Sequence, residues 1–497
     1  MPSILTGNQP IHKRLGGATP FNPIILMSMF LGGLIGVTFF GGEWIPILVV
    51  TMLPFLFYAI VRSSMLVFLI WIGATPILSN FVAVNMGAGI PDITINRIAA
   101  SILFFVLVVQ VATGAKKYQK VDVAEWLMVV IVLLMLPGIL NGHRPIQAAQ
   151  QIFDSIITPF IVYTLARNLI TSREQVRPLL WTIGIVTLYS ASFGFYEHFT
   201  EHSLFTASGM LNWQETGIQD RIQGPFPSPS ALGTVMVGGV VFFLYMFIND
   251  RRFMVRLFAT VVLIIHSTTI FWSYRRSVWM GFATTIFFLT ILEKRVRTIV
   301  LWVALFTVTF LALNWGPITE SEVYQVRFAN VRTVNDRWVI WLTSWEIIKN
   351  YPLFGCGFGN FGLYYDKFFT FFGNTVTTSY AHNIASTHNS YIRWWVEGGP
   401  MVTLAYLALL GVFIKRLISY VTGRVKHAFV GRTEVMVFLG LFTTQYVQAL
   451  TTDMVFYTKY PGILVFLLAG VLSHSRELPK PKPIRPVTAG QASPGKA

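Results

Sequence analysis

Long runs of apolar residues, separated by short polar connections, make up most of this chain. A run of about 20 apolar residues is long enough for an α-helix to cross the hydrocarbon core of a bilayer. We find fourteen such runs, near residues 21–41, 43–61, 64–82, 97–115, 122–140, 146–167, 176–196, 229–249, 253–273, 277–293, 297–315, 391–415, 434–452 and 456–474. The pattern predicts an all-α polytopic transmembrane bundle of about fourteen spans. Very short connections between some runs also allow a count of twelve to fourteen.

Two long polar stretches interrupt this pattern and divide the chain. The expected parts are an N-terminal transmembrane half (1–196), a first outer loop (197–228), transmembrane helices (229–315), a large periplasmic loop (316–390), C-terminal transmembrane helices (391–474) and a basic, proline-rich, disordered tail (475–497). A long polar insertion in an otherwise apolar chain is a natural place for a working site. The two outer loops are therefore the regions in which we look for chemistry.

Composition supports the membrane assignment and argues against nucleic acid as a partner. Hydrophobic residues make up 54% of the chain and charged residues only 12%, with a mean hydropathy of +0.61, whereas soluble domains average roughly 25% charged residues. The net charge of +16 does not point to nucleic acid, because the basic residues lie in short connections between apolar runs. The single cysteine, Cys356, excludes an intramolecular disulfide.

The basic residues also predict the topology. Most of the 37 lysines and arginines fall in alternate connections, which the positive-inside rule places in the cytoplasm. With these connections inside, the number of spans is even and both termini are cytoplasmic. The two long loops are therefore expected on the outer side of the membrane.

A minority of arginines lie on the outer side, where the positive-inside rule does not explain them. Those of interest are Arg221 before one span, Arg275 and Arg276 in a short connection, and Arg337 at the start of an amphipathic segment. Guanidinium groups bind phosphate oxygens in a bidentate manner, which suits a diphosphate held at the membrane surface. The alternative is that each is an interfacial arginine that pairs with lipid phosphates or nearby acids. For Arg393, close to Glu397, we favour that alternative.

The segment 337–400 is the most polar part of the outer side. Helical spacing places Trp338, Trp341 and Trp345 on one face of a short amphipathic helix, which we expect to pack on lipid or on the bundle. Four glycines follow between Gly355 and Gly362, but the run follows a helix and lacks a GK[ST] sequence, so we reject a phosphate-binding P-loop.

A histidine near the end of this segment is the candidate general base. His388 lies just before an apolar span, and an unperturbed imidazole pKa near 6.5 suits proton transfer at neutral pH. The structural alternative is an interfacial hydrogen-bonding residue. His382 is six residues away and out of helical register, and no nearby cysteine completes a ligand set, so no metal site is predicted.

Four motifs in order resemble the bacterial O-antigen ligase/polymerase family, which are integral membrane glycosyltransferases. They are RIQGPFPSPSALG, SYRRSVW, R-x-x-x-W followed by PLFGCGFGNF, and HNSYIRWWVEGGP, while PDITINRI resembles a segment of the exopolysaccharide branch. The resemblance covers residues 200–415 well, and Gly399–Pro400 departs from the leucine or isoleucine common in the family.

The resemblance implies a donor glycan linked to undecaprenyl diphosphate and an acceptor that is a glycan or lipid A–core, with no cofactor. It also maps functional roles onto Arg221, Arg276, Arg337 and His388, with Arg275 and Arg276 as alternatives and Arg276 preferred because it precedes the serine. The resemblance does not distinguish a ligase from a polymerase. It also allows a polysaccharide assembly complex as a partner. Two hypotheses from different functional classes are a flippase of lipid-linked glycan and a non-catalytic component of an export complex.

Overall fold

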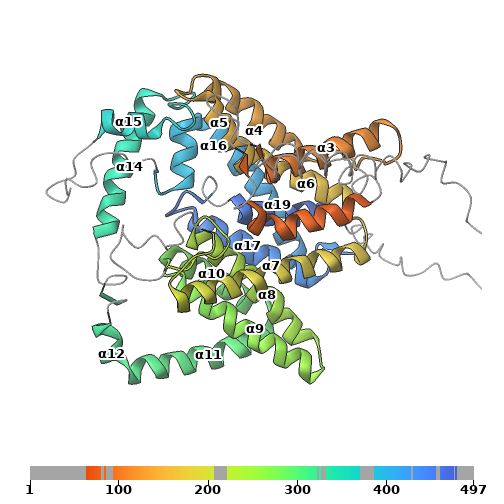
Figure 1. Cartoon of the computed structure of the whole chain (residues 1–497), viewed down its shortest axis with the longest axis vertical. Coiled ribbons are helices and arrows are strands. Elements are labelled where there is room, and N and C mark those ends of the chain that lie inside the picture. Colours follow the sequence, from red (N-terminus) through yellow and green to blue (C-terminus); the bar gives the residue numbers. More distant parts are fainter. Residues whose placement is uncertain are drawn as a thin grey trace, which may run out of the picture. The chain divides into compact units, whose positions relative to one another are not determined.

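The structure is a computed structural model in which most of the chain after residue 62 is described (Figure 1). The described residues are 63–79, 83–84, 93–205, 221–321, 324–325, 332–369, 386–426, 429–454, 459–474 and 476–477. The chain divides into two compact units, residues 1–67 and 68–497, and nearly all described residues belong to the second. The predicted spans near 21–41 and 43–61, and most of the predicted tail, lie outside the described residues.

The long elements are all helices. In chain order they are an apolar helix Ser63–Ser79, α3 (Ile95–Ala112), α4 (Val123–Leu140), α5 (Pro145–Ile152), the π-helix η1 (Phe153–Ile157), α6 (Thr158–Leu169), α7 (Arg173–Thr200), α8 (Pro229–Asn249), α9 (Phe253–Trp272), α10 (Arg276–Leu292), α11 (Lys294–Leu313), α12 (Trp315–Glu320), α14 (Arg332–Asn350), α15 (Phe361–Phe368), α16 (Ser390–Val421), α17 (Arg432–Gln448) and α19 (Lys459–Leu472). The β structure of the described residues is two antiparallel pairs of two-residue strands. β1 (Ala83–Val84) pairs with β2 (Ile93–Thr94), and β3 (Val425–Lys426) pairs with β4 (Arg476–Glu477).

The helices confirm an all-α membrane protein. Each predicted span that falls on described residues coincides with a helix, and α5, η1 and α6 together make up the span predicted near 146–167. By length and composition, seven of the described helices can cross a membrane, and three shorter apolar helices accompany them. The total of fourteen spans stays a prediction.

The interior of this helical assembly forms around α8, which packs against α7, α9, α10 and α17 (Figure 1). Small residues let these helices approach closely. A Cβ atom at Gly233 would lie 2.4 Å from Val278 of α10, and one at Gly238 would lie 2.7 Å from Leu441 of α17. Side chains at these two positions would therefore push the neighbouring helices apart.

Helix α16 has a break near its start, and the glycine-rich run 355–362 forms hydrogen bonds to the backbone at this break. Gly399 has φ +78, outside the helical region, and Pro400 follows it. The break frees two carbonyl groups, which accept hydrogen bonds from the amides of Cys356 (to Val396, 2.7 Å) and Gly357 (to Glu397, 3.1 Å). The glycine run thus satisfies buried backbone groups of α16.

The amphipathic helix predicted around residues 338–348 is part of α14, but its buried face differs from the tryptophan face. Ile340, Thr343 and Ile347 are fully buried, whereas Trp338 and Trp345 are half exposed. The Thr343 hydroxyl bonds back to the Val339 carbonyl oxygen over 2.9 Å, which allows a polar residue into the core. Exposed tryptophans of this kind suit a membrane interface, and the expectation that their face packs on lipid or on the bundle stays a prediction.

Candidate active site

The turn between α9 and α10 presents Arg275 in a constrained backbone. Tyr274 has φ +45, an uncommon value for a bulky residue, and Arg275 directly precedes the first turn of α10. The turn is braced by the Trp279 indole, which donates to the Ile270 carbonyl oxygen over 3.1 Å and stacks on Phe271. Arg275 therefore extends from a turn whose geometry is set by its neighbours.

One buried carboxylate holds the loop that carries Arg221 against the end of α7. The amides of Gln223 and Gly224 donate to Glu197 Oε2 over 2.7 and 2.6 Å, and the Ser203 hydroxyl donates to Oε1 over 2.7 Å. Gly224 has φ +54, a conformation that favours glycine. Glu197 thus determines the path of the chain just after Arg221.

A second buried carboxylate, Asp453, organises the loop that carries His388. It is fully buried and accepts hydrogen bonds from Ser386 Oγ (2.6 Å) and Thr387 Oγ1 (2.9 Å). The His388 amide donates to Ser386 Oγ over 3.1 Å. Arg393 Nη1 lies 3.3 Å from the same carboxylate. The loop is therefore connected to α16 and to the chain beyond α17 through one acidic side chain.

Further hydrogen bonds join this loop to its neighbours. The Trp341 indole of α14 donates to the Thr387 carbonyl oxygen over 3.1 Å. Asn389 caps α16, because its Oδ1 accepts from the amides of Tyr391 (2.9 Å) and Ile392 (3.1 Å). His388 itself has φ +51. Such backbone conformations persist when the surroundings over-determine them, and they cluster at functional sites.

Four of the predicted site residues are connected electrostatically through Arg275. Burial, and then the charges of Arg221 and Arg337, lower the pKa of Arg275 to about 10. The Nε of Arg275 is buried without a hydrogen-bond acceptor among the described residues. A buried guanidinium N–H with no acceptor, beside two further positive charges, is an environment that favours an anion.

His388 belongs to the same group of charges. Burial lowers its pKa below the usual value, the Asp453 carboxylate raises it, and the positive charges of Arg337 and Arg275 lower it. The net direction is downward, so the imidazole is predominantly neutral at neutral pH and able to accept a proton. We call Arg221, Arg275, Arg337 and His388 the arginine–histidine cluster.

The surroundings of Arg393 and Arg276 differ from those of the cluster. Arg393 is buried and forms ion pairs with Glu397 (3.1 Å) and Asp453 (3.3 Å), as favoured for it from the sequence. Arg276 is the first residue of α10. The sequence favoured Arg276 over Arg275, but it is Arg275 whose charge acts on His388. We therefore propose Arg275, the alternative that the sequence left open, for this role.

Sequence reasoning missed the two acids that position the cluster. The partners of Glu197 and Asp453 lie up to 67 residues away in the chain, so no local motif marks these two acids. Their one signal is an acidic residue at the outer end of a predicted span. Within the described ranges, no group of three or more His, Cys, Asp or Glu side chains is placed to hold a metal ion.

Comparison with known proteins supports the family resemblance over part of the chain. Residues 259–407 match the family model described as O-antigen ligase. The matched segment contains Arg275, Arg337 and His388. A search of curated proteins finds no match. The family match confirms the resemblance of the sequence to O-antigen ligases.

Proposed function

We propose that this chain transfers a glycan from a polyprenyl diphosphate, such as undecaprenyl diphosphate, to an acceptor hydroxyl, because residues 259–407 match the O-antigen ligase family model and the chain has several helices able to cross a membrane. The proposal is supported by the arginine–histidine cluster, in which the charges of Arg221 and Arg337 act on Arg275, and the charges of Arg275 and Arg337 act on His388. We place the reaction on the periplasmic face of the inner membrane.

The proposed reaction assigns a role to each member of the cluster. The acceptor hydroxyl oxygen attacks the anomeric carbon of the reducing-end sugar, and the bond from that carbon to the diphosphate oxygen breaks. The diphosphate leaves with the electron pair, and His388 takes the hydroxyl proton. Arg221, Arg275 and Arg337 stabilise the charge that develops on the leaving group, the task that preorganised donors perform in many enzymes. In this mechanism the arginines supply the positive charge, so we expect no requirement for a metal.

The direct test is transfer by the purified protein from a lipid-linked oligosaccharide. His388→Ala should lower kcat/KM by about 10²–10⁴, the usual contribution of general base catalysis. Arg144→Ala is the matched control, since Arg144 is exposed, lies in another predicted outer connection and should leave the rate unchanged. Full activity of the His388 variant would make this histidine an interfacial residue and remove the proposed base.

Two additions to the same assay test the finer parts of the proposal. Wild-type activity should persist in EDTA; loss in chelator with recovery on added metal would refute charge stabilisation by arginine alone. Offering lipid A–core or a second lipid-linked repeat as acceptor separates ligase from polymerase, because only the acceptor differs between the two reactions. Formation of longer lipid-linked chains would identify a polymerase.

A further inference from the structure

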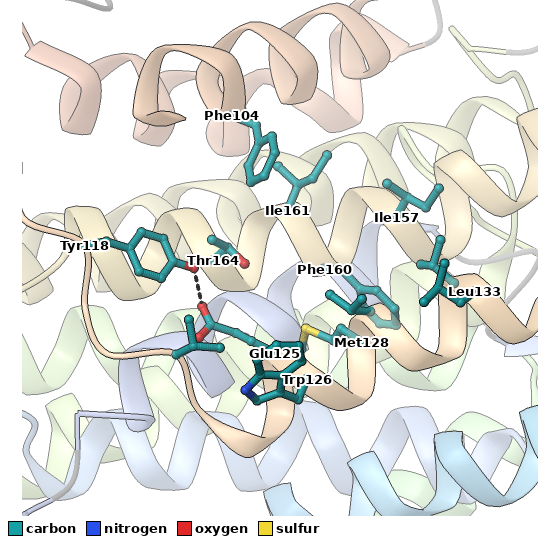
Figure 2. A pocket seen from close by; sticks show the side chains of 13 residues that line it. Phe104, Tyr118, Glu125, Trp126, Met128, Leu133, Ile157, Phe160, Ile161 and Thr164 are labelled. Carbon is teal, nitrogen blue, oxygen red and sulfur yellow. Dashed lines mark hydrogen bonds between the residues drawn. The ribbon is translucent and has the colours of Figure 1, made fainter. Parts of the chain in front are cut away.

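A groove on the side of α3, α4 and α6 is not used by the proposed reaction. α3 and α4 both pack against α6, and a cavity of about 440 Å³ lies between them (Figure 2). Its lining is almost entirely apolar and includes Phe104, Met128, Val129, Leu133, Ile157 and Phe160. Its volume lies within the range of pockets that bind small molecules.

The polar atoms of the groove gather at one end. The Tyr118 hydroxyl donates to Glu125 Oε1 over 2.7 Å (Figure 2), and Glu125 also forms a buried ion pair with Arg167. Arg167 lies 3.8 Å from Asp122, and Arg416 lies 2.7 Å from the same carboxylate. Both acids at this end are therefore neutralised by arginines of the protein.

Three lysines at the same end have no such partner. Lys116, Lys117 and Lys120 lie in the connection between α3 and α4, which also supplies Tyr118 to the lining. None of the three forms an ion pair among the residues that the structure describes. Burial lowers the pKa of Lys116, and a nearby anion would favour its charged form.

This connection is built against α6 by hydrogen bonds. The Gln119 amide donates to Asn168 Oδ1 over 3.0 Å, and Arg167 Nη2 donates to the Lys120 carbonyl oxygen. The backbone that carries the lysines is thus held in a defined position next to Tyr118 and Val121, which line the groove. A cationic end joined to an apolar groove matches the form of an amphiphile with an anionic headgroup.

The dimensions indicate which amphiphile. The α4 residues that line the groove run from Glu125 to Leu133, which corresponds to about 12 Å along a helix axis. One leaflet of a bilayer has a hydrocarbon thickness of about 15 Å, half of the total. The groove therefore accommodates an acyl chain that extends through a single leaflet.

We propose that this groove binds one acyl chain of an anionic glycerophospholipid, with the lipid phosphate at Lys116, Lys117 and Lys120. By the positive-inside assignment this lipid belongs to the cytoplasmic leaflet, whereas the arginine–histidine cluster is predicted on the periplasmic side. The site is thus separate from the proposed donor site and does not depend on the proposed reaction.

Native mass spectrometry of the full chain, released from detergent with phosphatidylglycerol or phosphatidylcholine, tests the proposal. The wild type should retain phosphatidylglycerol more tightly. Lys116→Gln/Lys117→Gln/Lys120→Gln should bind it about a hundredfold more weakly, since each basic residue near a headgroup contributes about fivefold. Lys294→Gln/Lys415→Gln/Arg424→Gln, which changes three exposed basic residues away from the groove, should bind as the wild type does.

A second pair of variants tests the groove itself. Val132→Trp fills the cavity and should reduce phosphatidylglycerol retention, whereas Val130→Trp, on an exposed position outside the lining, should not. Equal retention of both lipids, an unchanged affinity of the groove triple variant, or no retained lipid at all would overturn the proposal. The last outcome would be expected if a predicted span within residues 21–61 occupies the groove. Thermal unfolding of each variant verifies that it is folded.

Discussion

The residues proposed to act are carried by unusual backbone conformations, and these conformations are stabilised by their neighbours. Tyr274 and His388 both have positive φ, at a cost of order 1–3 kcal/mol each. A hydrogen bond donated by Trp279 braces the first turn, and hydrogen bonds accepted by Asp453 brace the second. Because the backbone is strained both next to Arg275 and at His388, we infer that the positions of these two residues are preorganised.

The adjacent arginines give the sharpest comparison at the residue scale. Arg275→Ala should lower kcat/KM by about 10²–10³, the usual loss for one charge-stabilising donor, because its Nε is buried beside Arg221 and Arg337. Arg276→Ala should lose less than tenfold. The measurement is initial-rate kinetics on both purified variants. A larger loss for Arg276 would return the role to the residue that the sequence favoured.

Asp453 is a positioning residue whose charge also acts on the proposed base. Its carboxylate raises the pKa of His388, so Asp453→Asn should lower that pKa further. Neutral His388 is the active form, and the acidic limb of kcat/KM should therefore start below pH 6.5 and move to still lower pH in the variant. A pH–rate profile of both proteins measures this shift. A variant with reduced rate but an unmoved limb would assign Asp453 a purely structural role.

The sequence identified the cluster residues but not what positions them. Arg221, Arg275, Arg337 and His388 stood out because charge at the outer ends of spans has no topological explanation. Asp453 gave no such signal, since a single carboxylate in an apolar stretch becomes interpretable only when its partners, Ser386 and Thr387, are brought to it by folding.

At the scale of elements, the break in α16 connects the glycine-rich run to the histidine loop. The first segment of α16 carries Arg393 and Glu397. Its last carbonyl groups accept hydrogen bonds from the amides of Cys356 and Gly357. The helix therefore ends as a short unit that is attached to the 355–362 run on one side and to Asp453 on the other. The orientation of His388 depends on both attachments.

Gly399→Ala should damage this arrangement. Gly399 has φ +78, and a Cβ there would lie 2.2 Å from the Leu353 carbonyl oxygen, which is backbone and cannot move aside locally. We expect a destabilisation of several kcal/mol, since backbone strain and a steric clash act together, and a loss of transfer activity. Thermal unfolding and the transfer assay measure the two effects.

Gly411→Ala is the control within the same helix. Nothing lies within 4 Å of a Cβ at Gly411, and alanine is favoured over glycine in a helix interior by roughly 0.5–1 kcal/mol. This variant should be as stable as the wild type or slightly more so. Equal behaviour of the two variants would mean that the break is not required.

Helix α14 shows why the sequence predicted an element but not its packing. The period of 3.6 residues was visible, yet the tryptophans dominated the pattern. The face that is buried contains Thr343 and Ser344, which satisfy their hydroxyl groups on the helix backbone over 2.9 and 2.7 Å. Small hydroxyl residues that bond to their own helix can be buried without a distant partner, and a hydropathy pattern does not reveal them.

At the scale of the whole molecule, the contacts sort the connections into the two sides that the charges predicted. Connections assigned to the outer side bond to each other, as His143 does to Asn360 (2.9 Å). Those assigned to the inner side do the same: Gln119 bonds to Asn168 (3.0 Å), and the charges of Arg173 and Glu434 lie 2.5 Å apart. Because the topology was assigned from the basic residues alone, these contacts are independent support for the alternation of spans.

The orientation of the two sides is the remaining prediction, and single cysteines can test it. Arg144→Cys places a thiol on an exposed position of a predicted outer connection, and Lys117→Cys does so on a predicted inner one. The native Cys356 gives little background, because it is buried and burial raises the pKa of its thiol, which keeps the reactive thiolate scarce. In spheroplasts, a membrane-impermeant maleimide should label Arg144→Cys at once and Lys117→Cys only after the membrane is opened. The reverse order would place the arginine–histidine cluster in the cytoplasm, where a periplasmic glycan donor cannot reach it. Immediate labelling of both would contradict the sorting of connections into two sides.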